Sequence, residues 1–386
     1  MGDNAARQQT KNMSINEEKI YACWLDAGLG LSRQKKRLLL KAAGSARQAY
    51  SLVINSSSGM LEAVIGAQDS QSLTQYLKTI TPQGLYELLE EREINYTYFM
   101  ESDYPQKFVD IPDAPFGIFY KGELPNENSV SAAVIGARKC TEYGRYMAEK
   151  IAGELAQRGV DIISGMALGI DGMAQSAALK AGGKTYAVLG GGVDNIYPAS
   201  NSELYYEILK NGAVISEYAP GTKPQKWQFP IRNRLISALS DVVVVIEANE
   251  KSGTFSTVDM ALEQGREVYA VPGRCTDCMS IGCNKLLRQG AGLATSAEDI
   301  ICDLGWRDRL NPKNLGDSKI KLHLSQTAKD IYDVLDIIPM AQDDIIRILQ
   351  QKGKSYPAEQ VSKALCELEL RRAAMKISGG YQLIKN

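Results

Sequence analysis

The sequence predicts an α/β protein built on a doubly wound, mostly parallel sheet, and two features of the residues from Ser131 onward predict it. Short apolar runs alternate there with segments of helical periodicity, which implies right-handed crossovers between parallel strands. Nearly continuous Val and Ile runs such as Val242–Ile246 are typical of strands that are buried on both faces of a sheet. The chain has 386 residues. Since one ordinary domain has about 100–200 residues, further domains are expected beside the sheet.

The N-terminal residues predict a short tail followed by a helix. Residues 1–13 are polar and are expected to be disordered. Ser14 and Glu17 have the spacing of a capping box ahead of an apolar period, so a helix is expected to begin there. Gly28 and Gly30 then predict the end of that helix.

Residues 14–100 are expected to form an all-helical domain. Ser32 opens a second helix, and Thr81, which precedes a proline, starts another. Helices joined by a Gly-x-Gly turn are typical of sterile-alpha-motif (SAM) and helix-hairpin-helix bundles, so a bundle of this kind is expected. The basic run Arg33–Arg37 is interpreted as a solvated helix face, and contact with nucleic acid is the alternative.

The sheet domain is expected over residues 101–307. The stretch 104–125 contains several Pro and Gly residues and predicts a linker or an edge strand. The strands that follow are expected at residues 132–135, 160–163, 185–189, 213–216, 241–248 and 267–271. The intervening segments have helical periodicity, as in the apolar repeat between residues 147 and 155.

The C-terminal residues predict a third domain. Residues 308–321 are polar and rich in turn formers, which indicates a linker. Residues 322–386 predict three helices and a hairpin on a Gly-Gly turn, which is a winged-helix-like arrangement. From residue 321 onward there are ten Lys and Arg against eight Asp and Glu, so DNA binding and protein contact stay equally open for this domain.

The charge balance and the single histidine exclude several classes of protein. The 44 Lys and Arg nearly equal the 45 Asp and Glu, which excludes a histone-like polycation but not a local basic groove. His323 is the one histidine, so sites with several histidine ligands are excluded, and chemistry that needs a histidine base or a Ser-His pair has almost nothing to work with. Seven cysteines, an odd number, favour reduced thiols over a disulfide framework.

Neither a membrane span nor secretion is predicted. The apolar run Val242–Ile246 is far shorter than the about 20 residues that a spanning helix needs. The first residues contain no apolar stretch like that of a secretion signal. A cytoplasmic location without a membrane partner is therefore expected.

Ligand binding is expected at the glycine-rich loops that follow successive strands, because ligands of doubly wound sheets bind beyond the carboxyl ends of the strands. Glycine lets the backbone approach an anion, and a helix N-terminus offers free N–H groups. These loops are Gly136-Ala137-Arg138, Ser164-Gly165 through Gly169 to Asp171, Gly190–Gly192, and Lys251-Ser252-Gly253-Thr254. Each could instead be an ordinary tight turn, and none has Walker A or dinucleotide-binding spacing.

The stretch Lys223–Arg234 combines four cations with Trp227 and Phe229 just before a helix. Cations that follow a backbone, together with aromatic rings on which bases stack, are typical of a groove for single-stranded nucleic acid. The alternative is that the two aromatic residues belong to the core, while Arg232 and Arg234 pair with nearby acids.

The spacing Cys275-x-x-Cys278-x4-Cys283 raises the possibility of a metal site. Structural zinc sites usually need a fourth ligand, and no second Cys-x-x-Cys is present. We therefore expect a surface loop of reduced thiols and no metal.

Read together, these residues closely resemble the DNA-processing protein A family (DprA, also called Smf). The resemblance covers residues 105–300 continuously, and its Phe-Pro-x-Arg-Asn-Arg element is specific. The matching segments are Ala133–Arg138, Ser164–Asp171, Val188–Pro198 with Asn201, Phe229–Arg234, Glu247, Ser252–Thr254, Gly265–Gly273 and Gly282–Ala291. The family's longer members also have a helical N-terminal part and a winged-helix C-terminal part.

The resemblance implies a Rossmann-like protein that binds single-stranded DNA, without catalysis and without a cofactor. It further implies protection of incoming DNA in natural transformation, a homodimer, and help in loading a RecA-type recombinase. It places Arg138 in a phosphate pocket and Lys226 and Phe229 on the DNA. The full set of expected DNA-binding residues is Gly136, Arg138, Ser164, Gly165, Gly169, Lys184, Lys226, Phe229, Arg232, Asn233, Arg234, Ser252, Gly253 and Thr254.

One position departs from the family pattern, and one enzyme class competes with this interpretation. Relatives commonly have His where this chain has Gln175, and little loss of binding is expected because an amide also donates and accepts hydrogen bonds. The competing class is the nucleoside-monophosphate phosphoribohydrolases, whose Pro-Gly-Gly-x-Gly-Thr-x-x-Glu loop supplies a carboxylate. The corresponding residues 251–257 of this chain contain no acid. A pure interaction scaffold is the third alternative.

Overall fold

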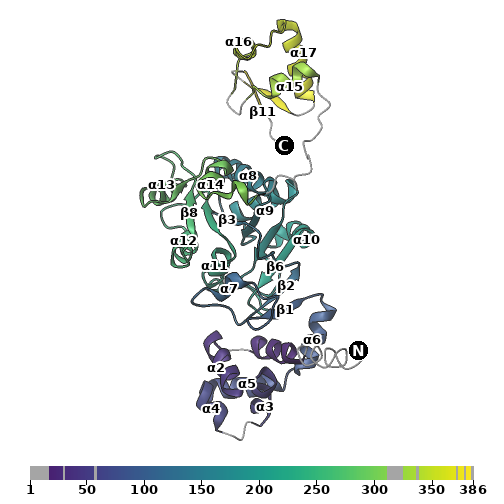
Figure 1. The fold of residues 1–386 in the computed structure, drawn as a ribbon, viewed down its shortest axis with the longest axis vertical. Coiled ribbons are helices and arrows are strands. Elements are labelled where there is room, and N and C mark those ends of the chain that lie inside the picture. The colour runs from purple at the N-terminus through teal and green to yellow at the C-terminus, as the bar shows by residue number, and fades with distance from the viewer. Residues whose placement is uncertain are drawn as a thin grey trace. The chain divides into compact units, whose positions relative to one another are not determined.

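A computed structural model describes residues 17–28, 31–55, 59–310, 325–335, 339–370, 373–377 and 380–383. The chain divides into two compact units, Met1–Leu315 and Gly316–Asn386, and each is described by itself (Figure 1). The expected disordered tail, the capping residue Ser14, His323 and most of the expected linker lie outside the described residues.

The first unit begins with a group of short helices. Residues 17–27 are helical. They are followed by α2 (Arg33–Ala43), α3 (Ala46–Ile54), α4 (Met60–Ile65), α5 (Ala67–Leu77) and α6 (Pro82–Glu91). The predicted starts at Ser32 and Thr81 are confirmed, because their side chains accept hydrogen bonds from the backbone N–H of Lys35 and Gly84. Assignment of this helical region to the SAM-like class stays a prediction.

A nine-stranded sheet forms the centre of the first unit within the described residues. Its strands are β1 (Asn95–Tyr98), β2 (Gly117–Gly122), β3 (Ser131–Ile135), β4 (Asp161–Ser164), β5 (Thr185–Val188), β6 (Gly212–Ser216), β7 (Val242–Val245), β8 (Glu267–Ala270) and β9 (Gly292–Leu293). Their order is β1-β2-β6-β5-β4-β3-β7-β8-β9. Neighbours from β6 to β9 are parallel, whereas β2 is antiparallel to both β1 and β6. The predicted mostly parallel α/β sheet is confirmed.

The antiparallel edge of the sheet differs from the sequence expectation. β1 falls inside the range expected to be helical, and it pairs with β2 so that Tyr96 lies opposite Phe119. The sequence Asn-Tyr-Thr-Tyr of β1 is rich in residues that favour strands, and three of its four residues are buried. The stretch 104–125, expected to be a linker or an edge strand, supplies β2, which lies between β1 and β6.

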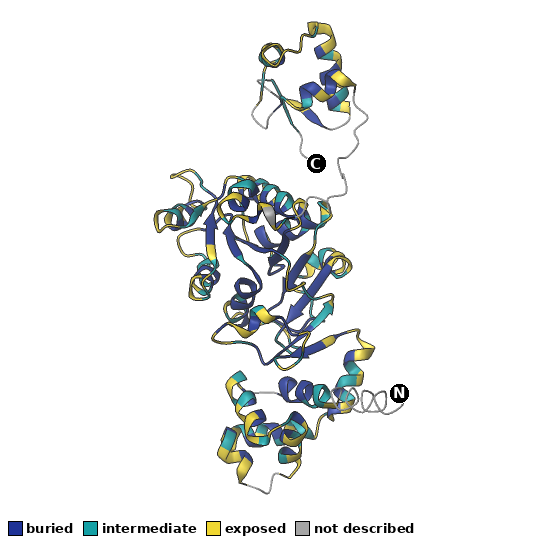
Figure 2. Ribbon diagram, in the orientation of Figure 1, coloured by how far each residue is buried: buried dark blue, intermediate teal, exposed yellow. Residues whose placement is uncertain are grey.

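Helices cover both faces of the sheet (Figures 1 and 2). One face packs on α8 (Glu142–Gln157), α9 (Ile170–Lys180), α10 (Ser202–Lys210) and α14 (Ala297–Asp303). The other packs on α7 (Gln106–Val109), α11 (Gln228–Leu239), α12 (Thr254–Glu263) and α13 (Ile281–Arg288). Along β3, Ala132 and Val134 face the first layer while Ala133 and Ile135 face the second, so the strand is buried on both sides.

The order of the strands places a switch point between β3 and β7. The chain moves from β3 through β4 and β5 to β6 in one direction, and then crosses to β7 on the other side of β3. Loops that leave β3 and β7 at their carboxyl ends therefore diverge, which is where doubly wound sheets bind ligands. We call this edge of the sheet, where the parallel strands end, the carboxyl edge.

The second unit is small and has its own core. It contains α15 (Gln326–Tyr332), α16 (Gln342–Gln351), α17 (Ala358–Leu370) and the hairpin strands β10 (Ala374–Ile377) and β11 (Gly380–Leu383). Ile331, Ile345 and Leu365 are fully buried in its core. These elements match the expected helices and hairpin, and membership of the winged-helix class stays a prediction. In neither unit do the described residues include a helix that is long and apolar enough to cross a membrane.

Candidate nucleic-acid interface

Close packing of loops explains two of the glycines at the carboxyl edge. Gly169 has φ +77°, and a Cβ built on it would lie 2.3 Å from the carbonyl oxygen of Ala137. A Cβ on Gly136 would lie 2.9 Å from the carbonyl oxygen of Glu247. The backbone N–H of Ile170 also donates to Ala137 over 3.2 Å. The loops after β3, β4 and β7 are thus pressed together, which only glycine permits at these positions.

A carboxylate of the protein itself, that of Glu247, occupies the N-terminus of α8. The Glu247 side chain is buried, and its Oε2 accepts a hydrogen bond of 2.9 Å from the backbone N–H of Thr141. The Thr141 hydroxyl donates to the other carboxylate oxygen and accepts from the N–H of Gly144 over 3.1 Å. An internal carboxylate therefore lies where an open anion site was expected.

The polar groups of the loop after β4 hold that loop in place. Ser164 Oγ donates to the carbonyl of Val134 over 2.8 Å, and the N–H of Gly165 donates to Asp171 over 3.2 Å. Burial raises the pKa of Asp171, and the nearby Arg232 opposes that rise. Asp171 therefore supports the loop.

Gln175 is fully buried beneath the same loop. Its Oε1 accepts from the N–H of Met166 over 3.1 Å, and its Nε2 donates to the carbonyl of Tyr186 over 3.1 Å. The expectation that this amide both donates and accepts is confirmed.

Arg232 of α11 points into the protein. Its Nη1 donates to the carbonyls of Gly165, over 3.1 Å, and of Val188. A Cβ on Gly165 would lie 2.5 Å from the guanidinium, so glycine leaves room for it. Burial lowers the pKa of Arg232 to about 10, which still leaves the group charged at neutral pH. Arg232 thus joins α11 to the loops after β4 and β5.

Asn233, next to Arg232, connects α11 to α12, the helix that follows the loop after β7. Asn233 Nδ2 donates to Ser256 Oγ over 2.9 Å. In that loop the Ser252 hydroxyl accepts from the backbone N–H of Thr254 over 3.2 Å, and Gly253 is the N-cap of α12. The structure therefore brings these expected site residues together along one edge.

Arg234 belongs to a buried group of charges that we call the four-charge cluster: Arg33, Asp113, Glu217 and Arg234. Arg234 Nη2 lies 2.6 Å from a Glu217 oxygen, and Arg33 binds the same carboxylate through Nε and Nη2 over 2.8 and 3.0 Å. Asp113 contacts both arginines. Of the four, only Asp113 has a largely exposed side chain.

The expectation of a solvated basic face on α2 was wrong. Lys36 is buried and lies 2.8 Å from the Asp26 carboxylate. Arg37 donates to the carbonyl of Pro115 over 3.1 Å, and its guanidinium lies over the ring of Phe99. Arg33, in the four-charge cluster, and Arg37 thus attach the helices to the sheet domain, whereas Lys36 joins two of the helices to each other.

Exposed cations and aromatic rings gather around the start of α11. We call this group the strand-end surface: Arg138, Tyr197, Lys226, Trp227 and Phe229. The Arg138 guanidinium lies 5.2 Å from the centre of the Phe229 ring, and the Tyr197 ring lies 5.6 Å from it. Trp227 is 56% exposed and Phe229 is half-buried, so the alternative that both are core residues was wrong. Within the described ranges neither Arg138 nor Lys226 forms an ion pair.

Lys184 is the expected site residue that lies apart from the others. It immediately precedes β5, and its carbonyl accepts from the N–H of Ile162 near the start of β4. Parallel strands begin at the edge opposite the one where they end, so Lys184 lies across the sheet from Arg138. Conversely, Tyr197 belongs to the strand-end surface although it was not among the expected site residues. Its position shortly after a glycine-rich loop could have indicated this placement.

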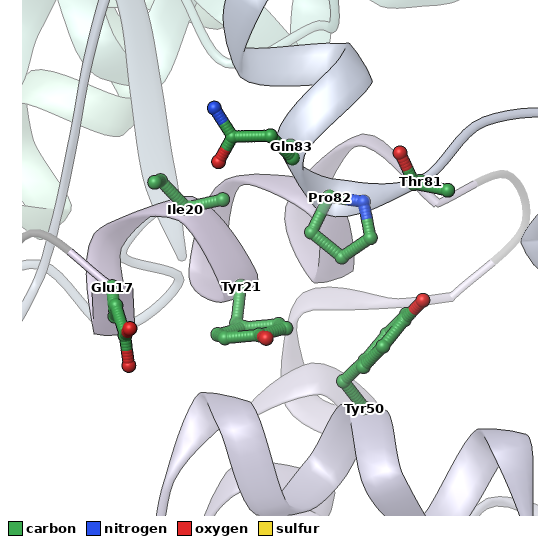
Figure 3. Close-up of a pocket in the computed structure, with 7 residues that line it drawn as sticks. All are labelled: Glu17, Ile20, Tyr21, Tyr50, Thr81, Pro82 and Gln83. Carbon is green, nitrogen blue, oxygen red and sulfur yellow. The ribbon is translucent and has the colours of Figure 1, made fainter.

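Two hollows of the first unit lie away from the strand-end surface. The larger, about 260 Å³, is among the N-terminal helices and is lined by residues that include Tyr21, Tyr50 and Pro82 (Figure 3). The smaller, about 40 Å³, is lined by Lys107 and Ser131 among others, at the start of β3. Neither hollow includes a residue of the strand-end surface.

The prediction of a surface loop of thiols holds for two of its three cysteines and was wrong for Cys283. Cys275 and Cys278 are exposed, whereas Cys283 is buried in α13. Among the residues that the structure describes, no three His, Cys, Asp or Glu side chains are grouped so that they could hold a metal ion.

Comparison with known proteins gives one family and several similar chains. The family model described as DNA recombination-mediator protein A matches residues 95–305. The chain is 42% identical over 219 residues to DNA processing protein DprA of Bacillus subtilis, covering 56% of this chain and 74% of that protein. It is 43% identical over 204 residues to DprA of Streptococcus pneumoniae, covering 53% and 72%.

A solved structure resembles the fold as well. The crystal structure of DprA from Streptococcus pneumoniae matches with a TM-score of 0.62 and 33% sequence identity. The match covers 74% of this chain and 97% of that one.

Proposed function

This chain belongs to the DNA recombination-mediator protein A family, and on that premise we propose that it binds single-stranded DNA along the strand-end surface. In this proposal it protects incoming DNA during natural transformation and helps to load a RecA-type recombinase. It acts without catalysing a reaction, as a homodimer in the cytoplasm.

The unpaired, exposed cations beside exposed aromatic rings carry the proposal. Arg138 and Lys226 are exposed and can contact phosphates, while Trp227, Tyr197 and Phe229 offer ring faces to bases. The contact between Arg138 and the Phe229 ring is worth about 0.5–1 kcal/mol at an exposed site, less than the about 1–3 kcal/mol of a stacked base. A strand of DNA can therefore displace it.

The state of the carboxylates supports a binding role over an enzymatic one. Glu247 and Asp171 lie at the carboxyl edge, but both are buried and accept hydrogen bonds from the protein's own backbone. The position at which phosphoribohydrolases have glutamate is Thr257, which is buried in the first turn of α12, after the loop that follows β7. Incubation with AMP tests this point, and steady release of adenine would contradict the non-catalytic role.

A fluorescence anisotropy titration with labelled oligothymidine across a salt series tests DNA binding. Because phosphate contacts release counterions, the logarithm of the affinity should fall linearly with the logarithm of the salt concentration. Unlabelled single strands should compete better than duplex of the same length, since stacking needs exposed base faces. Tighter binding of duplex, or no binding at low salt, would reject the proposal.

The partner and the oligomeric state rest on family membership and need separate tests. Multi-angle light scattering of the full chain should give the mass of two copies. Purified RecA-type recombinase should form filaments faster on a protein-coated single strand when this chain is added. A monomer, or unchanged filament formation, would remove the corresponding part of the proposal.

A further inference from the structure

We propose that the helical region of the first unit, residues 17–92, positions the segment 217–227 for DNA binding without touching DNA itself. The inference rests on the proposed function, because its readout is the affinity for single-stranded DNA. Two connections carry it, one through Arg33 and one through Arg92.

The positioned segment has no regular structure of its own. Residues 217–227 connect the end of β6 to the first residue of α11 and contain no helix or strand. The segment nevertheless carries Lys223, Lys226 and Trp227, all of them exposed. A stretch of this kind keeps its side chains in a binding-competent arrangement only where other parts of the molecule hold it.

The first connection holds the beginning of the segment. Arg33 of α2 makes two hydrogen bonds to Glu217, over 2.8 and 3.0 Å, from a position 184 residues away in the chain. Glu217 also binds Arg234 of α11 over 2.6 Å, so one buried carboxylate joins the helical region to the DNA-facing helix. Tyr218, the residue after Glu217, has its ring edge-on to Trp227 with the ring centres 6.3 Å apart. This contact links the first connection to the strand-end surface.

The second connection holds the middle of the segment. Arg92, directly after α6, lies 2.8 Å from Asp194 in the loop after β5. The other oxygen of Asp194 accepts from the backbone N–H of Gly221 over 2.7 Å. The N–H of Gly192 donates to the carbonyl of Thr222 over 2.9 Å. The helical region therefore reaches the segment at two separate points.

The connections are expected to act through the fraction of molecules in which the segment is ordered. If the binding-competent arrangement falls to about one tenth of the population, the apparent affinity falls about tenfold. The number of phosphates contacted does not change, so the slope of log affinity against log salt should stay the same. Loss of a residue that touches phosphate lowers that slope by about 1 instead.

For the two acidic residues, a purely electrostatic effect on DNA affinity would have the opposite sign. Glu217 and Asp194 are negative and lie near a surface that would bind a polyanion. If they acted only through charge, Glu217→Gln and Asp194→Ala would each tighten DNA binding. If they position the segment, each weakens it.

The test is an anisotropy titration of the full chain with labelled oligothymidine for wild type, Arg33→Ala, Glu217→Gln and Asp194→Ala. We expect about tenfold weaker binding for each variant with an unchanged salt slope. Arg33→Lys should recover part of the loss, because it keeps the charge but not the two-pronged geometry. The matched control is Arg47→Ala, since Arg47 forms an exposed pair with Glu17 in the same helical region.

The possible outcomes separate this inference from the proposed function. If wild type binds and the three variants bind equally well or more tightly, the positioning role is rejected and DNA binding stands. If wild type does not bind, the proposed function itself fails. If Glu217→Gln or Arg33→Ala unfolds, Asp194→Ala decides alone, because its partner Arg92 is about half exposed and the pair lies outside the four-charge cluster.

Discussion

Two basic stretches with four cations each, Arg33–Arg37 and Lys223–Arg234, have opposite surroundings in the folded chain. The cations of the first stretch each meet an acid or a carbonyl from another segment, as Arg33 meets Glu217. In the second stretch the two arginines turn inward, while Lys223 and Lys226 stay exposed. The comparison shows that a cation can bind a polyanion only where no residue from a distant part of the chain pairs with it.

The largest difference between the two groups should appear in stability. Glu217→Ala leaves Arg33 and Arg234 without their shared carboxylate, and breaking a buried pair in this way costs about 3–5 kcal/mol. Lys226→Ala should change the free energy of unfolding by less than about 0.5 kcal/mol, because Lys226 is exposed. Urea unfolding followed by tryptophan fluorescence measures both, since Trp24, Trp227 and Trp306 all lie in the first unit. Similar losses for the two variants would remove the distinction.

The next largest effect should come from the aromatic part of the strand-end surface. Phe229→Ala should weaken oligothymidine binding by about 1–3 kcal/mol, the value of one stacked base, and leave the salt slope unchanged. Tyr206→Ala is the control, because Tyr206 is an exposed aromatic residue on α10 that is not part of this surface. Equal anisotropy curves for Phe229→Ala and wild type would show that bases do not stack there.

The exposed cations should have a somewhat smaller effect with a different signature. Arg138→Ala and Lys226→Ala should each weaken binding about tenfold, or about 1.4 kcal/mol, and lower the salt slope by about 1. Their melting temperatures should stay close to that of wild type, because neither residue forms an ion pair within the described ranges and Arg138 loses only its exposed contact with the Phe229 ring. An unchanged slope would mean that these side chains do not contact phosphate.

The smallest effect is expected at Lys184, which serves as an internal reference. It is as exposed a lysine as Lys226, but it precedes β5 at the opposite edge of the sheet. Lys184→Ala should change the affinity for oligothymidine by less than about 0.5 kcal/mol. A loss as large as that of Arg138→Ala would place DNA on the wrong edge for the proposed function.

Local patterns in the sequence were sufficient to predict most of the helices and strands. Val and Ile runs located the parallel strands, and Ser32 and Thr81 located helix starts, because hydrophobic periodicity and capping depend on neighbouring residues. β1 was missed because its four residues follow directly on a helical region. The glycine-rich loops were also located, but their glycines proved to serve loop-to-loop packing at Gly136 and Gly169.

The partners of charged residues could not be predicted in the same way. The sequence shows Arg234 as one more cation in a basic stretch, and it shows Glu217 as an isolated acid. Their pairing depends on how α11 packs beside the end of β6, and Arg33 joins them only because α2 docks on the sheet domain. No local pattern encodes either contact. The same holds for Glu247, whose carboxylate reaches Thr141 across 106 residues of chain.

The carboxylate of Glu247 at the start of α8 also bears on competition inside a cell. If this helix N-terminus were unoccupied, ATP or inorganic phosphate could bind there. At millimolar concentration these metabolites would compete with a polymer for the site. Because the Glu247 carboxylate occupies that position, a free phosphate would have to displace it, whereas a long strand could still add many weak contacts along the strand-end surface.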